Sequence, residues 1–183
     1  GIIHEFNERE YTVFELMVIM LIQSDNTAAN KIIDIVGMEQ INEDIIAMGL
    51  KNTRLNRKTN DERTDITDIE NITTAYDLSK IWKHLSNGTF LSKDNGQMLI
   101  DILRRQQIKN KLALYIPDDL KIEISSKTGD KKGVENDTAY LELPKGKFVF
   151  TVLSQDIPNS VYGTVSLAKC GKMMWDGVMN NWN

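Results

Sequence analysis

Two short triplets contain the residue types that could carry out chemistry in this chain. Ser24-Asp25-Asn26 lies in a polar break between two apolar stretches, and Lys127-Thr128-Gly129 follows far downstream. A serine hydroxyl can pass a proton, and a lysine at a strand edge can bind an anion. Any given triplet occurs by chance in roughly one chain in fifty of this size. The pair therefore gains weight only through order, spacing and context.

The first two-thirds of the chain, and its C-terminal end, have the pattern of helices. Thr12 and Glu15 form a capping box before a nearly continuous apolar run. Gly37 is expected to end the second helix, because glycine readily adopts a left-handed backbone. Apolar periodicity predicts helices over 12–22, from the Ser24-Asp25-Asn26 break to 37, and over 39–48, 74–85, 91–105 and 159–182.

The pattern changes between residues 119 and 155, where three strands are predicted over 120–124, 138–143 and 148–153. Turn residues at 144–147 predict an antiparallel hairpin between the last two strands. The last strand is almost wholly apolar, which is typical of a sheet packed between helices. Lys127-Thr128-Gly129 would lie at the end of the first strand.

The composition is ordinary for a soluble globular protein, with 183 residues, 41% hydrophobic and 26% charged. The net charge is −4 and the basic residues are scattered, so we expect no nucleic-acid partner. Cys170 is the single cysteine, and His4 and His84 have no ligand-like neighbours, so we expect no metal and no cofactor. Neither a membrane span nor a signal peptide is recognisable.

Taken together, the triplets resemble the signature of class A β-lactamases and penicillin-binding proteins, in which S-D-N and K-T-G follow an upstream S-x-x-K. The likeness extends over 12–57 and 127–182, whereas 58–71 and 87–119 match loosely. The resemblance implies an α/β (α+β) fold of the β-lactamase/transpeptidase type. In that fold a helical region packs with an antiparallel sheet and a C-terminal helix.

The resemblance implies substrate-binding roles for the second triplet and the residue after it. A β-lactam carries a carboxylate beside a strained amide, so its site must hold an anion and stabilise an oxyanion. Lys127 would bind the carboxylate with help from the Thr128 hydroxyl, and Gly129 would let the substrate approach the strand. The backbone N–H of Asp130 would be an oxyanion-hole donor, although its carboxylate is unexpected beside an anion site. A solvated strand-end lysine is the alternative for Lys127.

For the first triplet, the resemblance implies that Ser24 relays a proton to the leaving nitrogen and that Asn26 contacts the substrate and the catalytic lysine. The alternative for Asn26 is helix capping, with Ser24 merely in the turn. Both roles can coexist.

The family's nucleophilic serine and its lysine, S-x-x-K, begin a helix well upstream of S-D-N. Only 23 residues precede Ser24 here, so we expect that helix and the N-terminal strands to lie outside this chain. The string Ser166-Leu167-Ala168-Lys169 also has the S-x-x-K form. It follows the apolar pattern of the terminal helix, and we interpret it as coincidence.

The polar stretch 56–71 is predicted to be a long surface loop. Class A enzymes place the deacylating glutamate two residues after an arginine that Arg57 resembles, and this chain has Thr59 there. Asp61 and Glu62 are the candidate substitutes, and we take Glu62 as the candidate catalytic carboxylate. Without an activating carboxylate, an acyl-enzyme would persist.

We therefore predict a single β-lactamase-like domain over 1–183, with a helical region to 118 and a sheet and terminal-helix region over 119–183. The leading function is β-lactam hydrolysis through an acyl-enzyme, with this chain alone inactive. The alternatives are a slowly deacylating penicillin-binding protein acting on D-alanyl peptides, and a non-catalytic binding module. The expected partners are a small β-lactam or D-alanyl peptide and a missing N-terminal segment or second chain. The family implies an extracytoplasmic location.

Overall fold

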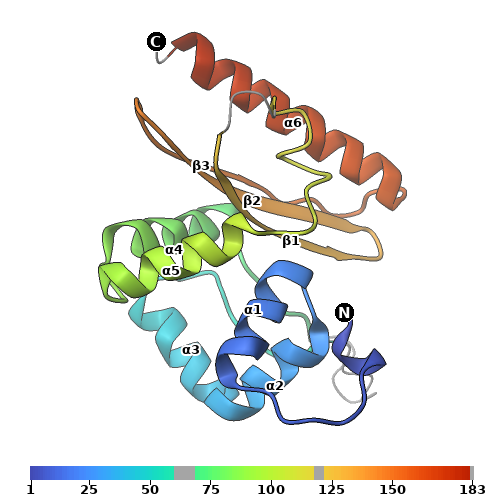
Figure 1. Cartoon of the computed structure of the whole chain (residues 1–183). Helices are drawn as coiled ribbons and strands as arrows, with labels where there is room; N and C mark the ends of the chain where they lie inside the picture. Colours follow the sequence, from blue (N-terminus) through green and yellow to red (C-terminus); the bar gives the residue numbers. More distant parts are fainter. Residues whose placement is uncertain (60–68, 118–121, 182–183) are drawn as a thin grey trace.

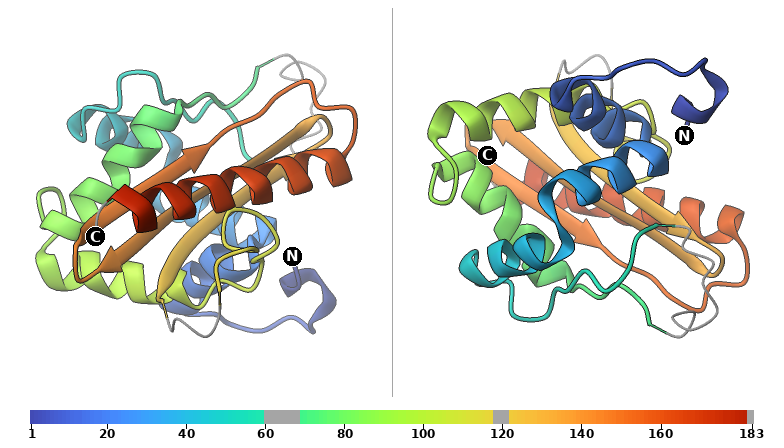
Figure 2. Two further views of the ribbon diagram at one scale, coloured as in Figure 1. Left: turned by 90° about the horizontal axis from the view of Figure 1, so that it is seen from above. Right: turned by 90° about the horizontal axis from the view of Figure 1, so that it is seen from below.

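Helices cover both faces of a three-stranded antiparallel sheet in the computed structural model, which describes residues 1–59, 69–117 and 122–181 (Figure 1). The strands lie in the order β1-β2-β3. Helix α6 crosses one face of the sheet, and α4 and α5 contact the other face (Figure 2). The predicted fold class is therefore confirmed. The bounds are Ile124–Lys131 for β1, Val134–Leu143 for β2, Gly146–Val152 for β3, Ala75–Asn87 for α4, Lys93–Arg104 for α5 and Ser160–Asn181 for α6.

The remaining helices form a second group next to α5. They are a short 3-10 helix at Ile3–Glu5, α1 at Val13–Gln23, α2 at Asn26–Val36 and α3 at Met38–Ala47. Helix α1 contacts both α2 and α5, which joins this group to the sheet. All six predicted α-helices are present, each within two residues of its expected bounds.

The predicted helix boundaries have the expected capping contacts. Glu15 donates its backbone N–H to the Thr12 hydroxyl over 3.2 Å, and the Glu15 carboxylate accepts the Thr12 N–H over 2.8 Å. Gly37 has φ +88° and donates to the Ile33 carbonyl at the end of α2. These contacts satisfy backbone groups that a helix end otherwise leaves unpaired.

The first strand differs from its prediction. It begins at Ile124, where the predicted strand ended, and Lys127-Thr128-Gly129 therefore lies inside the strand and not at its end. The reason is a second hairpin: Gly133, with φ +78°, turns the chain so that β1 pairs with the polar first half of β2. Backbone pairing holds these polar residues in strands that apolar alternation does not predict. The predicted hairpin between β2 and β3 is confirmed.

The core has one apolar cluster on each face of the sheet. On the α6 side, Ala139 and Leu141 pack with Trp175 of α6. On the other side, Tyr140 packs with Trp82 of α4, and their rings are stacked with centroids 5.7 Å apart. Successive strand residues point to opposite faces, so β2 contributes to both clusters. This packing fixes the helical layers against the sheet on which the second triplet lies.

Candidate active site

Ser24-Asp25-Asn26 forms the tight break between α1 and α2. Ser24 has φ 53° and ψ 41°, a left-handed conformation that is uncommon for a residue other than glycine. The fully buried Asp25 is the N-cap of α2, because its carboxylate accepts the Ala28 N–H over 2.9 Å. Helix capping by Asn26, the alternative weighed from sequence, is therefore wrong. Asn26 is instead the exposed first residue of the helix.

Lys127 links the two triplets directly. Its ammonium donates to the Ser24 hydroxyl over 2.8 Å and to the Thr128 carbonyl over 2.6 Å. Burial lowers the pKa of Lys127 to about 8, although the nearby Asp130 and Asp137 carboxylates act in the opposite direction. A partly desolvated lysine touching a serine hydroxyl can both hold an anion and exchange a proton near neutral pH. The alternative of a solvated strand-end lysine does not fit this environment.

The rest of the second triplet lies on the outer strand of the sheet. The Thr128 hydroxyl is buried and has no hydrogen-bond partner in the described part of the chain. At Gly129 an added Cβ would meet only the Asn136 side chain, at an ordinary 4.0 Å. The fold therefore does not itself demand glycine there. Asp130, near the end of the same strand, is exposed.

Gln106 lies beside the candidate site and was not predicted from the sequence. It is fully buried, and its amide donates to the Leu21 carbonyl over 3.0 Å and to the Ser126 carbonyl over 3.2 Å. These carbonyls lie three residues before Ser24 and one residue before Lys127. Gln106 therefore ties the end of α1 to β1 beside the Ser24–Lys127 contact. A polar residue just after a helix carries no sequence signal for such a role.

Thr59 lies against α2, close to Asn26. Its N–H donates to the Asn30 side-chain oxygen over 3.0 Å, and the Asn30 amide donates to the Thr59 carbonyl over 2.9 Å. The Thr59 hydroxyl lies 3.4 Å from the Asn26 carbonyl oxygen. The residue expected to replace the family's glutamate is thus beside the first triplet. Asp61 and Glu62, the candidate substitutes, lie outside the described residues.

The two ends of the 56–71 stretch are held together. Asn71 accepts the backbone N–H groups of Asn56 and Arg57 and donates to the Arg57 carbonyl. Glu70 pairs with Arg57 at 3.3 Å and with Lys131 of β1 at 2.8 Å. Hydrogen bonding from Lys131 is the main cause that lowers the pKa of Glu70. The loop that carries Thr59 is thereby tethered to the strand that carries Lys127.

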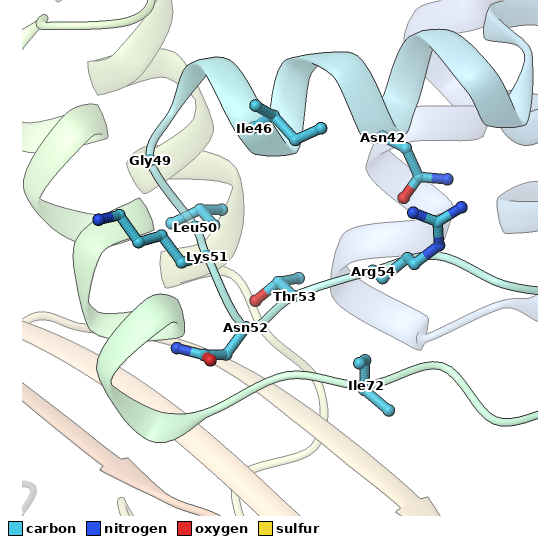
Figure 3. A pocket seen from close by; sticks show the side chains of 9 residues that line it. All are labelled: Asn42, Ile46, Gly49, Leu50, Lys51, Asn52, Thr53, Arg54 and Ile72. Atoms are coloured by element: carbon cyan, nitrogen blue, oxygen red, sulfur yellow. The ribbon is translucent and has the colours of Figure 1, made fainter.

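Two other features lie away from this arrangement. Ser166-Leu167-Ala168-Lys169 is in α6, on the sheet face opposite α4 and α5, which supports its interpretation as coincidence. A cavity of about 390 Å³ lies between α3 and the segment 49–54 (Figure 3). No predicted site residue lines it, and its Asn42 side chain is already bonded to the Leu55 backbone. Ser24 and Lys127 therefore form the candidate site, because their contact joins two predicted motifs.

Comparison with known proteins agrees with this geometry. A sequence profile described as the Beta-lactamase enzyme family matches residues 1–178. A β-lactamase structure from Sphaerobacter thermophilus superposes with a TM-score of 0.89 at 27% identity, covering 97% of this chain and 67% of that one. A search of curated proteins gave no match.

Two further structures are more distant in sequence, and their similarity supports the fold alone. PBP-A has a TM-score of 0.82 at 24% identity, covering 98% of this chain and 66% of that one. A representative class A β-lactamase from Bacteroides cellulosilyticus has a TM-score of 0.78 at 20% identity, covering 91% and 64%. The chain thus spans about two thirds of the length of these proteins. From its sequence and its fold, the chain belongs to the β-lactamase enzyme family.

Proposed function

We propose that this chain supplies the substrate-binding part of a serine hydrolase that reacts with β-lactams through an acyl-enzyme. The observation that carries the proposal is the 2.8 Å hydrogen bond between Lys127 and Ser24, which joins two segments far apart in sequence. Family membership supports the same reaction class. The proposal assigns the nucleophilic serine to an S-x-x-K segment outside these 183 residues.

The contacts of Lys127 support a division of labour in the reaction. A protonated Lys127 would attract the β-lactam carboxylate and polarise the Ser24 hydroxyl. Ser24 would then donate its proton to the amide nitrogen as the ring opens and recover one from Lys127, whose pKa of about 8 suits transfer near neutral pH. The proton that the nucleophilic serine releases on attack would restore the charge of Lys127. The Thr128 hydroxyl, which has no hydrogen-bond partner among the described residues, would bind the carboxylate, and the Asp130 N–H would stabilise the oxyanion. Asn26 would contact the amide side of the substrate.

Slow deacylation is the second candidate, and the position of Thr59 favours it. Thr59 lies beside Asn26, with both of its backbone polar groups held by Asn30. A threonine hydroxyl cannot act as the carboxylate base that activates water. A mutant of PBP-A has been captured in an acyl-enzyme complex with penicillin-G. By analogy, this protein would bind penicillins durably, and D-alanyl peptides would be its other substrates.

The test uses a longer protein in which this chain is joined to an S-x-x-K segment of the family. Mixed with a chromogenic cephalosporin, it should release a stoichiometric burst of product followed by slow turnover, and mass spectrometry should find one covalent adduct. A serine-to-alanine change in the S-x-x-K segment is the control and should remove the adduct. If the longer protein is folded but forms no adduct, the acyl-enzyme proposal is wrong.

An extracytoplasmic location is part of the proposal, because that is where proteins of this family typically meet their substrates. None of the helices in the described ranges is long and apolar enough to cross a membrane. Protease accessibility on intact cells, with a cytoplasmic protein as reference, would test the location. Protection equal to that of the reference would contradict it.

A further inference from the structure

Lys111 is a buried cation beneath the end of the β1–β2 hairpin. Its side chain is 3% exposed, and its ammonium lies 2.5 Å from Glu135 and 3.4 Å from Asp130. Asp130 and Glu135 are directly opposite each other in the strand register. Both carboxylates therefore converge on one lysine from the same face of the sheet.

The two acidic partners of Lys111 differ in their surroundings. Glu135 is 5% exposed and also accepts a hydrogen bond from Ser160, so it is a structural partner of Lys111. Asp130 is 58% exposed, and its contact with Lys111, at 3.4 Å, is longer than that of Glu135. The Asp130 carboxylate can thus leave Lys111 at little structural cost, whereas Glu135 cannot.

Asp130 also lies next to a donor that lacks an acceptor. Thr128 is two residues away on the same strand, so both side chains are on the face that Lys111 covers. The Thr128 hydroxyl is buried and unpartnered within the described residues. A hydroxyl donor on the same strand face as a lysine suits a carboxylate ligand, and the Asp130 carboxylate already pairs with that lysine.

The net charge of the groups around Lys111 opposes the binding of an anionic ligand. Two lysines, Lys111 and Lys127, lie near three acids, Asp130, Glu135 and Asp137. Lys111 pairs with Asp130 and Glu135, and both lysines interact electrostatically with Asp137. The acids thus exceed the lysines by one charge. Removal of the Asp130 charge alone would balance the cluster.

We propose that Asp130 is a specificity-determining residue whose side chain competes with the carboxylate of an incoming ligand at Thr128 and Lys111. The side chain weakens the binding of carboxylate ligands and leaves the binding of neutral ligands of the same shape unaffected. The inference rests on the proposed function only in using the same strand edge for the ligand.

The test measures reversible binding to the 183-residue chain by NMR titration, following the amide signals of Thr128 and Gly129. The probes are N-acetyl-D-alanine, a carboxylate, and N-acetyl-D-alanine amide, its neutral counterpart. Asp130→Asn should tighten binding of the carboxylate about fivefold and leave binding of the amide unchanged, as expected for a half-exposed charge contact. The gain should shrink at high salt. Asp176→Asn removes the same charge from an exposed ion pair on α6 and should change neither probe.

A second variant tests whether the Thr128 hydroxyl is the donor to the ligand. Thr128→Val, combined with Asp130→Asn, keeps the side-chain shape and should abolish most of the gain, because the hydroxyl has no partner to lose among the described residues. The inference is overturned if Asp130→Asn binds the carboxylate no better, if it tightens both probes equally, or if no variant binds either probe. The titration makes no covalent bond, so its result is independent of acylation. If the protein never forms an acyl-enzyme, but Asp130→Asn still tightens binding of the carboxylate probe about fivefold, only the proposed function is contradicted.

Discussion

Lys127 should lower the free energy of unfolding of the protein, although the candidate site depends on it. Burial lowers the pKa of Lys127 to about 8, and the difference from an ordinary lysine corresponds to a cost of about 3 kcal/mol for keeping the side chain charged. Replacing Lys127 by Met removes this cost but also removes the donor to Ser24 and to the Thr128 carbonyl. Each lost hydrogen bond costs about 1 kcal/mol, so the two together cost about 2 kcal/mol. We expect Lys127→Met to increase the free energy of unfolding by about 1 kcal/mol at pH 7.

The pH dependence of this stability gain tests whether the charge of Lys127 causes it. The folded-state pKa is below the unfolded-state value, so the cost is fully present below about pH 8 and is relieved as pH rises toward the ordinary lysine range. Urea unfolding of both proteins should therefore show that Lys127→Met is the more stable protein at pH 7, and that this gain disappears or reverses at a pH near 10. Lys83→Met, at an exposed position on α4, is the control and should be neutral at both. A Lys127→Met protein that is no more stable at pH 7, or whose gain is independent of pH, would refute the reasoning.

Three further predictions concern the chemistry. The 183-residue chain alone should form no penicilloyl adduct, because Ser24 serves Lys127 as a hydrogen-bond partner and the nucleophile is assigned elsewhere; an adduct on Ser24 in the mass spectrum would show that Lys127 activates it. In the longer protein, Lys127→Ala should slow acylation by carboxylate-bearing β-lactams roughly 100-fold or more, and Lys131→Ala or Lys132→Ala far less; equal stopped-flow rates would remove Lys127 from the site. Thr59→Glu should speed deacylation by as much as about 100-fold and reduce the size of the burst. If Glu62→Gln alone abolishes steady turnover of the parent protein, Glu62 is already the base and this prediction is wrong.

The helical part of the fold was predictable from sequence because its signals are local. The capping box at Thr12 and the left-handed Gly37 act within a few residues of the helix ends that they define. The strand β1 was misplaced because its second half is polar and is held by pairing with β2, which no local pattern reveals. Ser125, for example, lies buried in this strand because its hydroxyl donates to the Ile100 carbonyl.

The candidate site was predictable where motifs carry the information and not where packing does. The Ser24–Lys127 contact follows from two triplets whose order and spacing resemble a known family. Gln106 and Lys111 belong to no motif, and their roles arise from carbonyls and carboxylates brought to them by the fold. The Asp25 cap was assigned to the neighbouring residue because Asp and Asn are equally good at that position.

The contact that Gln106 makes has a consequence for how this sequence can drift over evolutionary time. Both hydrogen bonds that its amide donates go to main-chain oxygens, which every amino acid provides. Leu21 and Ser126 can therefore be exchanged for other residues without altering the alignment of α1 with β1, provided that their own packing is respected. Gln106 has no such freedom, because a shorter side chain would not reach and a glutamate would not donate. Among related sequences, invariance at this position should accompany variation at the two positions that it joins.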